Sequence, residues 1–210
     1  MAHIVRYYIR KWVITLKILL VSDKEVSYIW DHFDAERFKD VELIISCGDL
    51  KAEYLSFLVT MIHVPLFYVP GNHNESYLKK PPEGCVSIDN QLIKYKNISI
   101  LGLGGSQKYN HGPFQYTDQQ MQKRISRLKH KIWWNGGFDI LVTHAPAYGL
   151  GDGEDLCHQG FKSFNKLLDQ YSPRYFFHGH QHLNYSRQSR IIQYKNTTII
   201  NAYEYYLLDY

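Results

Sequence analysis

Residues 174–182 read Arg-Tyr-Phe-Phe-His-Gly-His-Gln-His, an aromatic run that stops at Gly179 and is followed by His180 and His182. The run predicts a buried strand that ends near the glycine. Side chains two positions apart on an extended chain point to the same side, so both imidazoles can face one cluster of metal charge. A histidine pair in a loop is not a site by itself. Its function depends on what the other strand ends supply.

The composition indicates one folded domain. The chain has 210 residues, of which 45% are hydrophobic and 15% aromatic, enough for one sizeable core. A formal charge of +4 is too small to predict specific nucleic-acid binding. The three cysteines form no CxxC, which is typical of a reduced protein, so we expect a cytoplasmic location. No apolar run reaches membrane-spanning length, because Lys17 interrupts the longest candidate, and we expect no membrane partner.

Residues 1–15 are expected to form an extension of unknown role ahead of a single domain at 16–210. The basic stretch from Arg6 to Lys11 and the apolar residues after it resemble a secretory signal. We reject that interpretation because no small-residue cleavage site follows. The acidic stretch Ser22-Asp-Lys-Glu25 comes next instead.

In the first half of the chain, apolar runs alternate with segments of helical periodicity. Runs typical of strands covered on both faces lie at 16–21, 41–46 and 64–69. Helices are expected at 26–39 and 50–63. This alternation predicts parallel strands joined by right-handed crossovers. In such sheets functional groups collect beyond the carboxyl ends of the strands.

The second half contains more consecutive strands. Thr117 and Gln120 predict a capping box for a basic helix that runs to about Trp134, and its basic residues are interpreted as a solvated face. The glycines at 102–106 fit no phosphate-binding spacing, so a tight turn is expected. The acidic loop at 148–160 is interpreted as a wall of the site. A helix is expected at 161–170 and strands at 86–95, 98–101, 137–143, 174–178, 191–194, 197–201 and 205–209.

Polar side chains follow five of the expected strands. They are Asp23 with Glu25, Asp49, Asn72 with His73, His144, and His180 with His182. A lone histidine is more often a core or surface residue. Together, however, these groups bring carboxylates, an amide oxygen and imidazoles from separate loops to one sheet edge. Two divalent metal ions that share a site require such a set.

The order of these motifs resembles the calcineurin-like metallophosphoesterase family, from about Leu16 to the C-terminus. The resemblance implies an α/β (α+β) fold, with two mixed β-sheets packed as a sandwich and flanked by helices. It further implies the roles of the site residues. Asp23 and His182 would bind a first metal ion, Asp49 would bridge, Asn72, His144 and His180 would bind a second, and His73 would act on the substrate without binding metal.

Two positions depart from the family pattern. Glu25 stands where the family usually has histidine, and its hard oxygen shifts the expected preference from zinc toward manganese, with iron and magnesium next. The stretch Gly71-Asn-His-Asn74 ends in a neutral amide where the family has a carboxylate. Either Glu75 then supplies the charge that supports protonated His73, or His73 is less basic.

We therefore expect a metal-dependent hydrolase of phosphate mono- or diesters. A hydroxide that bridges two divalent ions would attack phosphorus in line, and His73 would protonate the leaving oxygen. The alternative is a binding or scaffold module that has kept the fold and lost turnover, which the departures at Glu25 and Asn74 favour. The sequence leaves open whether the substrate is a monoester or a diester.

Overall fold

The computed structural model describes residues 16–183 and 189–210, and this part of the chain forms two mixed β-sheets and a small third one. The first sheet has the order β13-β1-β2-β3-β4, and its strands are β1 (Lys17–Ser22), β2 (Leu43–Ser46), β3 (Leu66–Tyr68), β4 (Val86–Ser87) and β13 (Glu204–Asp209). The second has the order β11-β12-β10-β9-β6-β5, and its strands are β5 (Gln91–Tyr95), β6 (Ile98–Leu103), β9 (Ile140–Thr143), β10 (Tyr175–His178), β11 (Ile191–Tyr194) and β12 (Thr197–Asn201). The short strands β7 (Ser106–Gln107) and β8 (Gln115–Tyr116) pair with each other.

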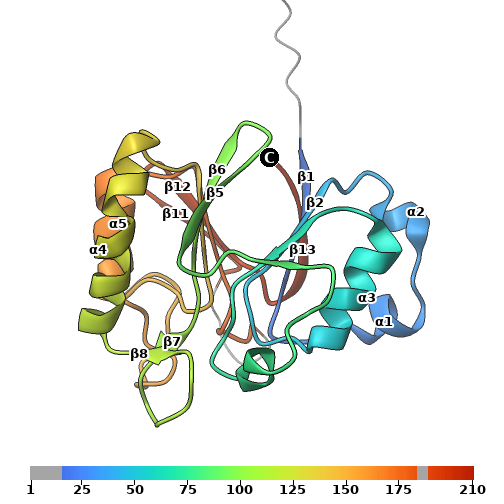
Figure 1. Ribbon diagram of the computed structural model, residues 1–210, viewed down its shortest axis with the longest axis horizontal. Helices are drawn as coiled ribbons and strands as arrows, with labels where there is room; N and C mark the ends of the chain where they lie inside the picture. Colours follow the sequence, from blue (N-terminus) through green and yellow to red (C-terminus); the bar gives the residue numbers. More distant parts are fainter. Residues whose placement is uncertain (1–15, 184–188) are drawn as a thin grey trace, which may run out of the picture.

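Helices cover the outer faces of both sheets (Figure 1). On the side of the first sheet lie α1 (Ser27–Asp31), α2 (Ala35–Phe38) and α3 (Ala52–Ile62). The second sheet is covered by α4 (Asp118–Trp134) and α5 (Lys162–Tyr171), and a 3-10 helix, η1 (Glu75–Leu78), follows β3. The four layers confirm the predicted sandwich of two mixed sheets flanked by helices.

Successive residues of β1 pack into different layers. Ile18 and Leu20 lie in the core between the two sheets, where they meet Phe177 of β10. Leu19 and Val21 point the other way, into the core beneath the first group of helices. Since alternate side chains leave opposite faces of a strand, a strand covered on both faces has to be apolar throughout. This explains the continuous apolar runs from which the strands were predicted.

Two expected elements are each divided in the structure. The helix expected at 26–39 is two short helices, because Asp34 takes an extended conformation and its side chain accepts a hydrogen bond from the Glu36 N–H, which caps α2. The strand expected at 86–95 is also divided. Its first part, β4, pairs with β3 in one sheet, and its second part, β5, pairs with β6 in the other. The chain crosses between the sheets at this point.

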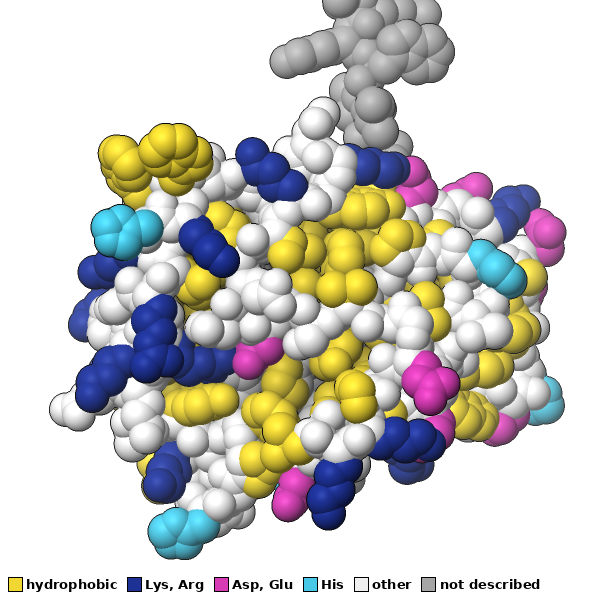
Figure 2. Space-filling model, in the orientation of Figure 1, with side chains coloured by type: hydrophobic (Ala, Val, Ile, Leu, Met, Phe, Trp, Pro, Cys, Tyr) yellow, Lys and Arg dark blue, Asp and Glu magenta, His cyan; other side chains and the backbone are white. Residues whose placement is uncertain are grey.

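The basic helix α4 has the predicted capping box, with Thr117 accepting from the Gln120 N–H and the Gln120 side chain accepting from the Thr117 N–H. Figure 2 shows Lys and Arg side chains gathered over the side of the molecule where α4 lies. Most of its basic residues are exposed, as predicted, but Arg124 is buried. Within the described residues, no helix has the length and apolar character needed to cross a membrane. The predicted extension at 1–15 lies outside those residues.

Candidate metal centre

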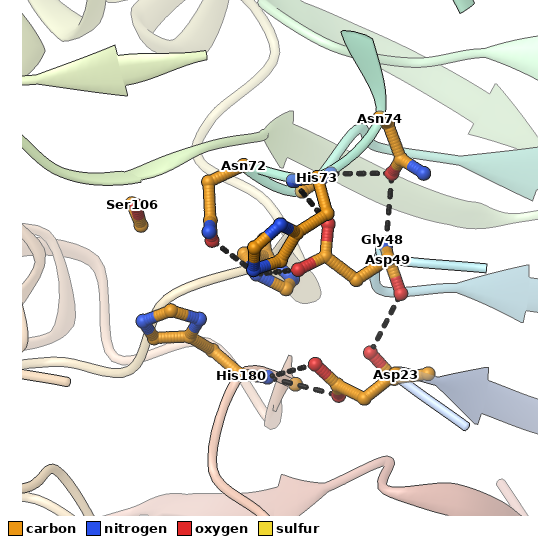
Figure 3. A network of polar contacts seen from close by, with 12 residues as sticks. Asp23, Gly48, Asp49, Asn72, His73, Asn74, Ser106 and His180 are labelled. Atoms are coloured by element: carbon orange, nitrogen blue, oxygen red, sulfur yellow. Dashed lines mark hydrogen bonds and ion pairs between the residues drawn. The ribbon is translucent and has the colours of Figure 1, made fainter. Parts of the chain in front are cut away.

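Loops that follow strands of both sheets meet at one place, where Asp23, Asp49 and His180 lie close together (Figure 3). The loops are joined directly by backbone hydrogen bonds: the Asp23 N–H after β1 donates to the Gly48 carbonyl after β2, at 3.0 Å. In the other sheet, the Gly179 N–H after β10 donates to the His144 carbonyl after β9, at 2.9 Å. The site therefore lies where the two sheets come together, and the predicted grouping of polar residues depends on that junction.

Three of the predicted residues meet at the Nε2 atom of His144. This atom lies 3.0 Å from the Asn72 Oδ1 atom and 3.1 Å from an oxygen of Asp49. The other ring nitrogen, Nδ1, lies 2.8 Å from the Cys47 carbonyl. A carbonyl only accepts, so Nδ1 carries a proton and Nε2 is the atom that can bind a cation. Asp49, His144 and His180 each offer a ligand atom within 4.8 Å of the others.

The charges at this point fit a cation. Burial opposes ionisation of His144, yet the Asp49 carboxylate outweighs burial and raises the pKa of His144 to about 9. The pKa of Asp49 changes in the opposite direction. Burial alone would raise it, but the His144 imidazolium lowers it to about 2. A proton on Nε2 thus occupies the position between imidazole and carboxylate that a metal ion would take. These residues fit a divalent ion in both geometry and charge.

Asp23 lies beside this group and is held by the chain of the opposite sheet. Both of its carboxylate oxygens lie 2.9 Å from the His180 backbone nitrogen (Figure 3). Burial raises the pKa of Asp23, and the negative charge of Asp49 acts in the same direction. The buried carboxylates of Asp23 and Asp49 repel each other, and positive charge between them would relieve this repulsion.

The backbone of the site is in a sparsely populated conformation. Asp23, Asp49 and His180 have φ angles of 64°, 56° and 67°, in the left-handed region that non-glycine residues seldom adopt. Two glycines allow the loops to approach this closely. A Cβ atom on Gly71 would lie 2.1 Å from the Asp49 Oδ1 atom, and one on Gly179 would lie 1.9 Å from the Ser22 hydroxyl. Such strain is found at functional sites more often than elsewhere.

His73 and Asn74 point in different directions. The His73 N–H donates to the Asp49 Oδ1 atom at 2.8 Å, and its side chain is exposed. His73 borders an open hollow of about 450 Å³ together with Asp23 and Asp49. The Asn74 Oδ1 atom accepts from the N–H groups of Asp49 and Gly71, at 2.8 Å each. Asn74 therefore fastens the loop backbone, a role that its sequence position did not suggest.

The match to a known protein family covers the part of the chain that forms this site. The model of the calcineurin-like phosphoesterase family matches residues 16–184. The chain belongs to the calcineurin-like phosphoesterase family. It is 27% identical over 177 residues to the uncharacterized protein MJ1162 of Methanocaldococcus jannaschii, a match that covers 78% of each chain. The crystal structure of TT1561 of Thermus thermophilus is similar in fold, with a TM-score of 0.65 and 17% identity, over 93% of this chain and 94% of that one.

Two of the predicted ligands have partners other than the group around His144. Glu25 borders the same hollow as Asp49, but its carboxylate pairs with the Lys51 ammonium at 2.9 Å and accepts from the Lys51 N–H. His182 is exposed, with its ring centroid 4.9 Å from that of Tyr203. Metal binding by these two residues stays a prediction. The neighbouring His178 is buried.

Two contacts that orient the candidate site were not predicted from the sequence. The Tyr109 hydroxyl accepts from the Asn72 amide nitrogen at 3.0 Å, which turns the amide oxygen toward His144. The Cys47 carbonyl fixes the His144 tautomer. Tyr109 lies in a Gly-, Asn- and Tyr-rich loop, which is the single signal that could have suggested it. A backbone carbonyl leaves no signal in the sequence.

Proposed function

We propose that this chain is a metal-dependent phosphoesterase that hydrolyses phosphate mono- or diesters at a site with two divalent ions. The observation that carries the proposal is the meeting of Asp49, His144 and His180, from three strand ends, in a geometry that suits a metal ion. Membership of the calcineurin-like phosphoesterase family supports it. The ligand atoms are oxygen and imidazole nitrogen, without sulfur. Manganese is our first candidate, with iron, magnesium or zinc as alternatives.

The proposed roles follow the contacts. Asp49 would bridge the ions, because it contacts His144 on one side and borders the same hollow as Asp23 on the other. The second ion would be held by Asn72, His144 and His180. The first would be held by Asp23, with Glu25 and His182 as the predicted additions. Glu25 would have to leave Lys51 for this role.

When bound, the ions supply Lewis-acid charge and a source of hydroxide, the proposed nucleophile, at neutral pH. The side chains around the ions would orient the substrate and supply the proton that the leaving group needs. The His73 side chain is exposed at the hollow while its backbone is anchored on Asp49, so it can reach a substrate without moving the site. We assign it the transfer of a proton to the leaving oxygen. The Asn74 side chain holds the backbone of Asp49 and Gly71, so its role in this assignment is to position the loop that carries His73.

The proposal is tested with two esters, bis-p-nitrophenyl phosphate and p-nitrophenyl phosphate, after metal removal and addition of Mn²⁺. We expect hydrolysis of at least one ester by the native chain and loss of both metal and activity in Asp49→Asn. Preference between the two esters assigns the substrate class. If neither ester is hydrolysed with any divalent ion, the chain is a binding or scaffold module and the proposal is wrong.

The role of His73 is tested separately with His73→Gln. This variant is expected to bind as many metal ions as the native chain. Its turnover should fall by about 10²–10⁴-fold on an alkyl ester, whose leaving oxygen needs a proton, and by less on a nitrophenyl ester. The matched control is His130→Gln, which changes an exposed histidine of α4. Equal losses on both esters would contradict proton transfer by His73.

A further inference from the structure

A second group of metal-binding side chains lies in the loop between β9 and α5. The carboxylate of Asp155, the thiol of Cys157 and the imidazole of His158 come from four consecutive residues. The thiol sulfur lies 2.9 Å from an Asp155 oxygen and 3.2 Å from the His158 Nδ1 atom, and Nδ1 lies 2.8 Å from the second Asp155 oxygen. The three side chains thus converge on one point.

This convergence does not fit a proton relay. In a relay of thiol, imidazole and carboxylate, the thiol contacts one ring nitrogen and the carboxylate contacts the other. Here both contact Nδ1 of His158, which carries at most one proton.

The geometry suits a tetrahedral cation. Zinc binds sulfur at about 2.3 Å and nitrogen and oxygen at about 2.0–2.2 Å, which places the ligand atoms of a tetrahedral site about 3.3–3.6 Å apart. The observed separations of 2.8 to 3.2 Å need to open by only about half an ångström. The side chains have room for this, since that of His158 is 44% exposed and that of Asp155 is 61% exposed.

The loop backbone already holds the Asp155 carboxylate in place. Its Oδ1 atom accepts from the N–H groups of Cys157 and His158, at 3.1 Å each. Backbone donors of this kind orient a ligating carboxylate and support it against the cation. The sulfur ligand distinguishes this group from the one around His144, which has only oxygen and nitrogen. Thiolate favours zinc-type ions over magnesium, calcium or manganese.

We propose that Asp155, Cys157 and His158 form a separate zinc-type metal site with one open coordination position. The loop that carries it also touches the first site. The Nε2 atom of His180 donates to the Cys157 carbonyl at 2.5 Å, and the Gln181 side chain donates to the His158 carbonyl at 2.7 Å. The ring centroids of His158 and His180 lie 5.3 Å apart. An ion on the loop therefore stiffens the segment that sets the His180 tautomer and leaves its Nδ1 atom free to bind metal.

Cobalt(II) tests this proposal on the full chain, because a cobalt–thiolate bond gives a charge-transfer absorption in the near ultraviolet that oxygen and nitrogen ligands do not give. We expect this band on titration of the reduced native chain. It should disappear in Cys157→Ser and weaken in His158→Gln. It should remain in Cys85→Ser, the matched control at another partly buried free cysteine. It should also remain in Asp49→Asn, which removes the first site but not the second.

Zinc content gives a second readout. At saturation, Cys157→Ser should bind one zinc ion fewer than the native chain, with an unchanged near-ultraviolet circular dichroism spectrum as evidence that the fold is intact. A charge-transfer band that persists in Cys157→Ser, or is absent from the native chain, overturns the proposal. None of these readouts depends on ester hydrolysis, so the second site stands or falls independently of the proposed activity.

Discussion

At the scale of single residues, Asp49 joins three loops. Its two carboxylate oxygens contact the His73 N–H and the His144 ring, and its own N–H donates to the Asn74 side chain. A longer side chain would carry the carboxylate past both partners. Asp49 also adopts a left-handed backbone conformation, which the Asn74 contact helps to hold. The position of the carboxylate therefore depends on Asn74, although Asn74 is not a predicted ligand.

Asn74→Ala is expected to destabilise the metal-free chain. The side chain is buried, and its loss leaves the N–H groups of Asp49 and Gly71 without their acceptor. An unpaired buried donor costs about 1–3 kcal/mol, so we expect the free energy of unfolding to fall by about 2–4 kcal/mol. Urea unfolding in the presence of EDTA measures this. Asn74→Asp keeps the acceptor oxygen and should recover much of the loss.

The control for this change is Asn196→Ala, at an exposed position in the turn between β11 and β12. Its effect should stay within about 0.5 kcal/mol. If Asn74→Ala were as stable as this control, the two hydrogen bonds would not hold the loop.

At the scale of elements, the sequence predicted strands better than it predicted their partners. Strands such as β1 and β2 were found because both faces are covered, which imposes an apolar run. The division of 86–95 between two sheets was missed, since periodicity does not say which strand a segment pairs with. The sequence also did not show the backbone conformation around His180 and His182. Their predicted same-side geometry assumes an extended chain, whereas His180 has a left-handed φ of 67°.

The helix α4 supports the site through a buried ion pair. Arg124 donates to the Asp89 carboxylate at 2.6 Å and to the Gly104 carbonyl at 2.8 Å. The next residue, Gly105, donates its N–H to the Pro70 carbonyl at 2.8 Å, directly before the loop that carries Asn72. The outer helix layer is thus connected to a predicted metal ligand by a short series of hydrogen bonds. The helix was predicted from sequence, but this connection was not.

Arg124→Met should weaken both the fold and the site. Removing one partner of a buried ion pair costs about 3–5 kcal/mol, and because the two side chains are 10% and 20% exposed we expect the lower end, about 3 kcal/mol. Thermal and urea unfolding measure the loss, and calorimetry should show weaker binding of Mn²⁺. Arg127→Met, at an exposed position on the same helix, is the control. Equal stability of the two variants would contradict a stabilising ion pair, and unchanged Mn²⁺ binding would show that the pair does not support the site.

At the scale of the whole molecule, the site depends on both sheets, so its protonation affects the stability of the complete fold. The buried histidines act in opposite directions. The raised pKa of His144, about 9, stabilises the metal-free fold below its unfolded value of about 6.5, and this contribution is lost as the pH rises through 9. Burial lowers the pKa of His178 to about 4 and that of His180 to about 3, so both oppose folding in acid. The metal-free chain should therefore be most stable near pH 6.5, with stability falling toward both pH 4 and pH 9.

His178 and His180 both contribute to the acid side of this profile, and the contribution of His178 can be tested separately. Between about pH 6.5 and pH 4 the unfolded chain binds a proton at this residue that the folded chain does not, so stability falls as the pH falls. A pKa lowered to about 4 corresponds to roughly 3 kcal/mol of stability lost in acid. His178→Gln retains a donor for the Gly179 carbonyl and should flatten the slope of unfolding free energy against pH, measured with urea and EDTA from pH 4 to pH 8. His130→Gln should leave the slope as it is. An unchanged slope in His178→Gln would mean that His178 is not the group that unfolding exposes to protons.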